Sequence, residues 1–131
     1  MLLDGTRRTL KICDFGFVRN VQTQMTSQRG TCLYMAPEVF NGKRYTEKCD
    51  VYSMGITIWE VLSRKVPYYE KHELKQIQLL TQIDDLDLRP SLNDLIFECP
   101  EQIKTLMQEC WDKNPDKRPS MQGILEILKQ F

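Results

Sequence analysis

Apolar and polar positions follow two different periods along this chain of 131 residues. Near the N-terminus, Leu10 and Ile12 alternate with polar neighbours, which predicts a short strand over residues 9–12. Leu2-Leu3 is a plausible partner for this strand across a turn at residues 4–6. Past Pro37 the spacing becomes helical. The pattern therefore predicts a β-hairpin followed by a mainly helical region.

The strongest helical segment is 46–62, where apolar side chains occupy nearly every direction around a 3.6-residue period. A helix of this kind that is too short to span a bilayer belongs at the centre of a core. Ser120 is a candidate N-cap for the last helix. The further helices are expected at 72–83, 100–111 and 120–131. Connectors are expected at 86–93 and 114–119, and a long surface loop at 20–30.

Composition changes this picture mainly by exclusion. Eighteen Lys and Arg residues balance eighteen Asp and Glu residues, so net charge gives no indication of nucleic acid or an anionic membrane as partner. No apolar run approaches the roughly 20 residues that a membrane span needs. The N-terminus places its apolar residues before its basic ones, the reverse of a signal peptide, and we expect a cytoplasmic protein.

Cysteine and histidine usage excludes further classes of chemistry. The five cysteines form no Cys-x-x-Cys pair and His72 is the single histidine, which disfavours a disulfide framework and a zinc site. One histidine in a polar stretch also argues against Ser-His-Asp or Cys-His catalysis, and we interpret His72 as a surface residue. Trp59 and Trp111 are interpreted as core anchors rather than binding platforms.

Candidate chemistry lies in short motifs, the first of which is Asp14-Phe15-Gly16. A carboxylate at the end of a strand can bind a divalent cation such as Mg²⁺, although a strand terminator is the alternative for the triplet alone. The motifs that follow are Gly30-Thr31, Tyr34-Met35-Ala36-Pro37-Glu38, Asp50-Val51-Tyr52-Ser53-Met54-Gly55, and the run from Cys110 through Arg118-Pro119 to Ser120.

In this order and spacing, the motifs resemble the C-terminal lobe of eukaryotic protein kinases, whose signatures include D-F-G, A-P-E and the phosphorylatable loop between them. Gly30-Thr31 before the A-P-E motif is similar to the serine/threonine type. The residues at 10–16, 22–26, 35–40, 47–51 and 118–121 are most similar to the TGF-β-activated kinase family of MAP kinase kinase kinases. Phe17 and Tyr34 replace that family's Thr and Trp, which indicates a diverged paralogue.

The resemblance implies a mainly α fold within the α+β kinase family. Residues 1–131 would form a partial kinase domain, the C-lobe from just after the catalytic loop to the last helix, without the N-terminal lobe. It would comprise a short β-hairpin, an activation loop, and about four helices around a buried central helix.

The resemblance also implies roles for individual residues. Asp14 would bind the Mg²⁺ that bridges the phosphates of ATP, and the nucleotide site would be lined by Cys13, Phe15 and Gly16. Phosphorylation would order the activation loop at one or more of Thr23, Thr26, Ser27 and Thr31. Thr23 and Thr26 are favoured because they fall at the family's activation-loop threonines; a solvated loop hydroxyl is the alternative for each.

Three residues have structural roles by resemblance. Glu38 and Arg118 would form a buried ion pair that ties the activation segment to the last helices. Asp50 would accept backbone hydrogen bonds from the catalytic loop.

The sequence contains no G-x-G-x-x-G loop, no V-A-I-K lysine and no H-R-D-x-x-x-x-N segment. We therefore expect ATP-dependent phosphoryl transfer to Ser/Thr from a longer gene product, acting on substrates of the MAP kinase kinase type with adaptor subunits, and not from this chain alone. The missing segments would leave a bare apolar face on the central helix, for which we expect a hydrophobic partner. The alternative is a complete, non-catalytic binding module that competes for an active relative's adaptors or substrates; an unrelated helical protein is disfavoured by the ordered motifs.

Overall fold

The structure is a computed structural model that describes residues 2–3, 10–11, 32–96 and 98–131. Strand β1 (Leu2–Leu3) pairs antiparallel with β2 (Leu10–Lys11), and Leu2 lies opposite Lys11. The expected hairpin is confirmed for these four residues. Its turn and the loop expected at 20–30 lie outside the described residues.

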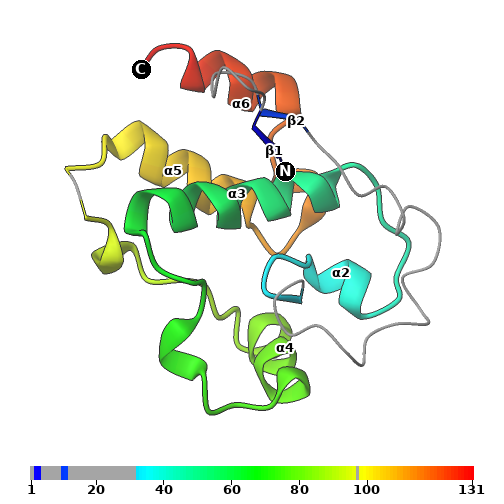
Figure 1. Ribbon diagram of the computed structural model, residues 1–131. Coiled ribbons are helices and arrows are strands. Elements are labelled where there is room, and N and C mark those ends of the chain that lie inside the picture. The colour runs from blue at the N-terminus through cyan, green and yellow to red at the C-terminus, as the bar shows by residue number, and fades with distance from the viewer. Residues whose placement is uncertain (1, 4–9, 12–31, 97) are drawn as a thin grey trace.

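Beyond the hairpin, the described chain is helical, which confirms the mainly α fold class (Figure 1). The α-helices are α2 (Pro37–Phe40), α3 (Lys48–Ser63), α4 (Gln76–Asp85), α5 (Glu101–Cys110) and α6 (Met121–Leu128). Single 3₁₀ turns are η2 (Tyr69–Lys71), η3 (Leu92–Asp94) and η4 (Pro115–Lys117). No helix in the described part of the chain is long and apolar enough to cross a membrane.

Local sequence signals account for the starts of two helices, α6 and α4. The Ser120 hydroxyl accepts a hydrogen bond from the Gly123 N–H at 3.1 Å, which confirms the expected cap of α6. Helix α4 was expected from His72 but begins at Gln76. The difference arises because residues 69–71 form a 3₁₀ turn, and the Gln78 side chain then accepts the Lys75 N–H at 2.9 Å.

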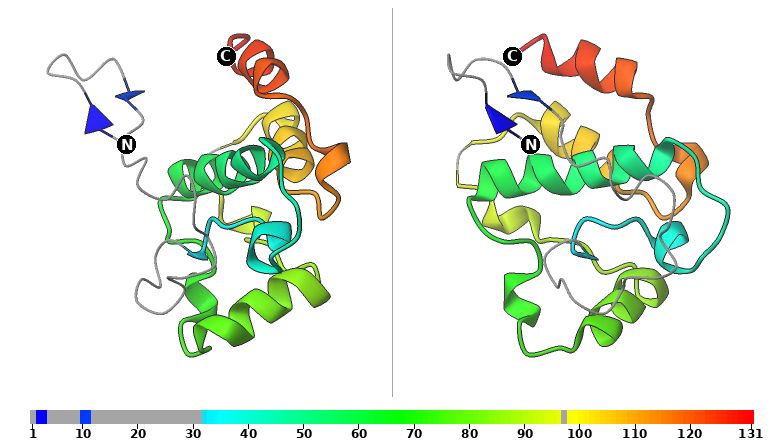
Figure 2. Two further views of the ribbon diagram at one scale, coloured as in Figure 1. Left: turned by 90° about the vertical axis from the view of Figure 1, so that its right-hand side faces the viewer. Right: turned by 45° about the vertical axis from the view of Figure 1, so that its right-hand side comes forward.

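Helix α3 runs through the middle of the molecule, with α5 and α6 on one side and α2 and α4 on the other (Figure 1 and Figure 2). Trp59 on α3 and Trp111 after α5 are 1% and 5% exposed, so both are core anchors as expected. The two helices approach so closely that a Cβ atom on Gly55 would lie 2.7 Å from Cys110 Cβ. Glycine is required at this crossing because any side chain would overlap its neighbour.

One face of α3 is not covered within the described chain. Val61 is 68% exposed, and Met54, Ile58 and Leu62 are only partly buried. The central helix is therefore buried toward α5 and α2 but bare along this stripe, in agreement with the expected bare face.

Candidate functional site

All of the residues expected to bind nucleotide or to be phosphorylated lie outside the described residues. These are Cys13, Asp14, Phe15 and Gly16 of the first motif and Thr23, Thr26, Ser27 and Thr31 of the loop. The structure does place Glu38, Asp50 and Arg118, and it brings two of them together.

Glu38 and Arg118 form a bidentate ion pair between α2 and the segment after η4. Arg118 Nη1 donates to Glu38 Oε1 at 2.6 Å, and Nη2 donates to Oε2 at 2.9 Å. The Arg118 side chain is fully buried and that of Glu38 is 9% exposed. Pro37 stands at the first position of α2, where its fixed φ suits the first helical turn that carries the buried Glu38. A fork of this geometry fixes both direction and distance between the two segments.

Arg118 also binds two carbonyl groups, so its buried charge has several partners. Its Nε donates to Asp112 O at 2.8 Å, and Nη1 donates to Lys48 O at 2.9 Å. Lys48 returns the contact, because its ammonium donates to Arg118 O at 2.5 Å and to Pro119 O at 3.1 Å. The start of α3, helix α2 and the segment 112–119 are thereby joined at one point.

A second cation, Arg89, has a side chain that is only 11% exposed, lies nearby, and was not predicted from the sequence. The guanidinium carbons of Arg89 and Arg118 lie 5.3 Å and 5.1 Å from the centre of the Tyr52 ring, within cation–π range. Arg89 Nε donates to Trp111 O at 2.9 Å, and Arg89 Nη2 lies 2.7 Å from Asp87 Oδ1. The only local signal was an arginine before a proline in an expected connector, which does not indicate burial.

Asp50 lies in the first turn of α3 and is exposed. Its carboxylate is near the positive end of the helix dipole, where a negative charge is favourable. The structure does not bring Asp50 to the Glu38–Arg118 pair.

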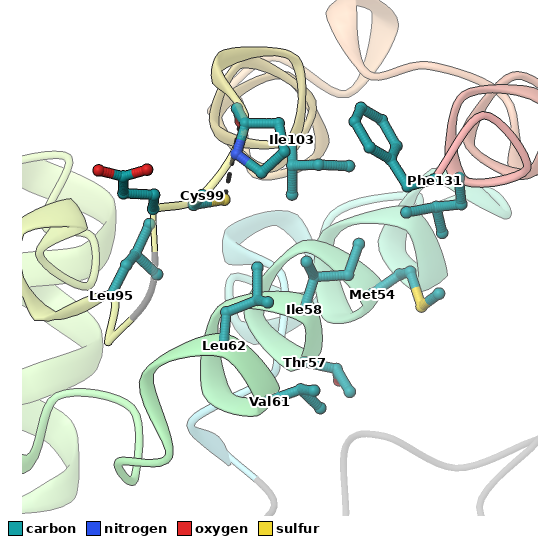
Figure 3. Close-up of a pocket in the computed structure, with 12 residues that line it drawn as sticks. Met54, Thr57, Ile58, Val61, Leu62, Leu95, Cys99, Ile103 and Phe131 are labelled. Carbon is teal, nitrogen blue, oxygen red and sulfur yellow. Dashed lines mark hydrogen bonds between the residues drawn. The ribbon is translucent and has the colours of Figure 1, made fainter.

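An apolar groove of about 660 Å³ runs along the bare stripe of α3 (Figure 3). We call it the α3 groove; its walls are residues of α3, the segment 95–100, the start of α5 and the end of the chain. Thr57 and Glu98 are the polar lining residues. The apolar ones are Met54, Ile58, Val61, Leu62, Leu95, Cys99, Pro100, Ile103, Leu128 and Phe131. The α3 side was expected from sequence, but Leu95, Cys99 and Phe131 are brought to it by tertiary packing.

Burial sets the acidity of the groups around these sites. Desolvation raises the pKa of the Cys99 thiol in the groove, so the neutral thiol is favoured there. Burial, followed by the bond to Glu60, raises the pKa of Tyr34 to about 12. The Tyr34 hydroxyl donates to Glu60 Oε2 at 2.9 Å, linking the segment before α2 to α3.

Among the described residues there is no cluster of three His, Cys, Asp or Glu side chains that could hold a metal ion.

Comparison with known proteins covers the whole chain. The profile of the protein kinase domain matches residues 1–128. Mitogen-activated protein kinase kinase kinase 7 of Drosophila melanogaster is 45% identical over 131 residues, which are 100% of this chain and 18% of that protein.

Two further relatives also match nearly the whole chain. Human mitogen-activated protein kinase kinase kinase 7 is 41% identical over 98% of this chain and 20% of its own length. A putative mitogen-activated protein kinase kinase kinase 7-like protein of Drosophila melanogaster is 42% identical over 98% of this chain and 33% of its own. The chain therefore spans between about a fifth and a third of these relatives.

Proposed function

Since the chain belongs to the protein kinase family, we propose that it is a C-terminal-lobe portion of a serine/threonine kinase of the mitogen-activated protein kinase kinase kinase class. The observation that carries this proposal is the 45% identity with the fruit-fly kinase, which extends over all 131 residues. The whole protein would transfer the γ-phosphoryl group of ATP to Ser or Thr of protein substrates of the MAP kinase kinase type, with adaptor subunits, in the cytoplasm.

In this proposal Asp14 binds Mg²⁺, since a carboxylate oxygen is a ligand that this hard cation prefers. Cys13, Phe15 and Gly16 line the nucleotide site beside it. When bound, ATP would supply the phosphoryl group, and its Mg²⁺ would offset the negative charge of the phosphates. The catalytic base and the second metal ligand have no counterpart in the sequence of this chain, so no transfer step is assigned to it alone.

The Glu38–Arg118 pair supports a role for the preceding segment as an activation loop. A loop that responds to phosphorylation needs one end fixed, so that new charge-assisted bonds change its path rather than the position of its anchor. The bidentate bond and the Lys48 contacts hold the start of α2 in this way. Phosphorylation of Thr23, Thr26, Ser27 or Thr31 would then act on the segment that ends at this anchor.

The α3 groove supports the proposal that further sequence packs on this lobe. Val61 on its α3 side is 68% exposed, and Phe131 at the end of the chain is 62% exposed. In the whole kinase we propose that the groove is covered by an apolar helix of the same domain, because the relatives extend far beyond the matched region. Covering such a surface removes apolar area from water and stabilises the lobe.

The experiment is a phosphoryl-transfer assay with Mg²⁺-ATP and a MAP kinase kinase substrate. We expect no transfer by residues 1–131, and transfer by the longer gene product that Asp14→Ala abolishes. Asp116→Ala, which changes an exposed aspartate of η4, is the matched control and should leave transfer intact. Transfer by the longer product that survives Asp14→Ala would refute the metal role.

The alternative function is a non-catalytic module that competes for an active relative's adaptors or substrates. Its support is the combination of an exposed apolar groove with a sequence that has no H-R-D segment. In this case Asp14→Ala would leave every cellular effect unchanged, whereas Val61→Asp in the groove would abolish it.

A further inference from the structure

Only two of the five tyrosines are well exposed. Tyr52 and Tyr68 are buried at 0% and 7% exposure, and Tyr34 is half-buried on Glu60. Tyr45 and Tyr69 are 47% and 37% exposed. Of these two, Tyr69 places its hydroxyl in a cluster of charged groups, whereas Tyr45 does not take part in that cluster.

The cluster is built on one ammonium group. Lys65 Nζ lies 2.6 Å from Asp94 Oδ1 and donates to the Tyr69 hydroxyl at 2.9 Å. The Tyr69 hydroxyl also lies 3.2 Å from Asp94 Oδ1 and 3.2 Å from Glu70 Oε1. The Lys65 ammonium therefore binds both the Asp94 carboxylate and the Tyr69 hydroxyl, and the Glu70 carboxylate lies next to that hydroxyl.

The Lys65–Asp94 bridge fastens η3 to the end of α3. Two hydrogen bonds act alongside it, since the Trp59 indole N–H donates to Ser91 O at 2.8 Å and the Ile96 N–H donates to Leu62 O at 3.3 Å. The fastened segment carries Leu95, which is a wall of the α3 groove. Breaking the Lys65–Asp94 bridge would therefore allow the Leu95 wall of the α3 groove to move.

We propose that Tyr69 is a phosphorylation site that controls this wall of the groove. A protein tyrosine kinase would join the γ-phosphorus of ATP to Tyr69 Oη, while the bond from that phosphorus to the β-phosphate oxygen breaks, the phenol proton leaves, and ADP is released. The new group carries about −1.5 to −2 charges. It draws Lys65 away from Asp94 and repels Asp94 and Glu70, so η3 loses its ion pair with Lys65 and is held less firmly to α3. The effect on a helix that binds in the α3 groove rests on the proposed function of that groove. The phosphorylation of Tyr69 and the release of η3 do not rest on it.

The test treats the purified chain with a broad-specificity tyrosine kinase and ATP, locates phosphate by mass spectrometry, and follows amide hydrogen exchange. We expect phosphate on Tyr69 and at least about twofold faster exchange at the Leu95 and Ile96 amides. Asp94→Asn should produce the same acceleration without phosphate. Tyr45→Phe is the matched control and should leave both results unchanged, whereas Tyr69→Phe should remove both.

Phosphate found on Tyr45 alone would overturn the proposal, as would phosphorylated Tyr69 with unchanged exchange in η3. Binding of an apolar dye to the groove, measured on the same samples with Val61→Asp as reference, reports separately on the groove. If exchange accelerates but the dye signal does not depend on Val61, the proposed docking role fails and the Tyr69 site stands.

Discussion

The buried pair of Glu38 and Arg118 allows the sharpest test of how this lobe is held together. In Glu38→Ala the Arg118 guanidinium keeps its bonds to Asp112 O and Lys48 O but loses its carboxylate. The charge stays buried, because Arg118 is 2% exposed and lies over the Tyr52 ring. Stranding a buried charge in this way costs about 3 to 5 kcal/mol.

This magnitude is large against the whole stability of a domain, which is about 5 to 15 kcal/mol. It corresponds to an unfolding constant more than about a hundredfold higher. Urea titration followed by fluorescence of the buried Trp59 and Trp111 measures it as a lower midpoint with an unchanged slope. Glu101→Ala is the matched control, since Glu101 is 79% exposed in its ion pair with Lys104, and it should cost less than about 1 kcal/mol.

A second variant separates charge from packing. Replacing both Glu38 and Arg118 by Met removes the stranded charge, and we expect much of the lost stability to return. If Glu38→Ala destabilises the chain no more than Glu101→Ala, the pair does not fix α2 and this reasoning is refuted.

Other expected outcomes concern helix packing, thiol reactivity and alkaline stability. Gly55→Ala should destabilise the chain by about 1 to 3 kcal/mol, because its new Cβ would lie 2.7 Å from Cys110 Cβ. Gly123→Ala, whose new Cβ would lie 3.4 Å from Ser120 Oγ, should be neutral or stabilising in the same urea assay. Burial raises the pKa of Cys110 to about 12, so iodoacetamide at pH 8 should label it far more slowly than Cys99; equal rates would contradict its burial. The pKa of Tyr34 rises from 10.0 to about 12 on folding, so the folded state holds this proton more tightly and loses stability as pH rises through that window. The stability of Tyr34→Phe should fall less steeply with pH between 10.0 and about 12, and a slope identical to that of the unchanged chain would contradict the raised pKa of Tyr34.

The parts of the fold that depend on local signals were predictable. The apolar period of α3 and the capping hydroxyl of Ser120 depend only on residues that are near in sequence. Helix α3 and the cap of α6 are both found where the sequence predicts them. The start of α4 was not predictable, because it depends on Tyr68, which adopts a left-handed φ of 57° before η2. Such a conformation is unfavourable for a bulky side chain and has no sequence signal.

Some residues of the site could also be predicted from the sequence, and others could not. Glu38 and Arg118 could be paired in advance only because motif order resembles a known family; their separation of 80 residues carries no local information. Arg89 and the Leu95 wall of the groove depend on how connectors fold back on α3. The nucleotide residues around Asp14 stay predictions.

The central claim is that these 131 residues act as a portion of a larger kinase. The most direct test is the intact mass of the endogenous protein, captured with an antibody against residues 120–131. We predict a mass well above 15.5 kDa, with an additional lobe that carries a strand lysine and an H-R-D segment. A mass of 15.5 kDa would contradict the claim and favour the non-catalytic binding module.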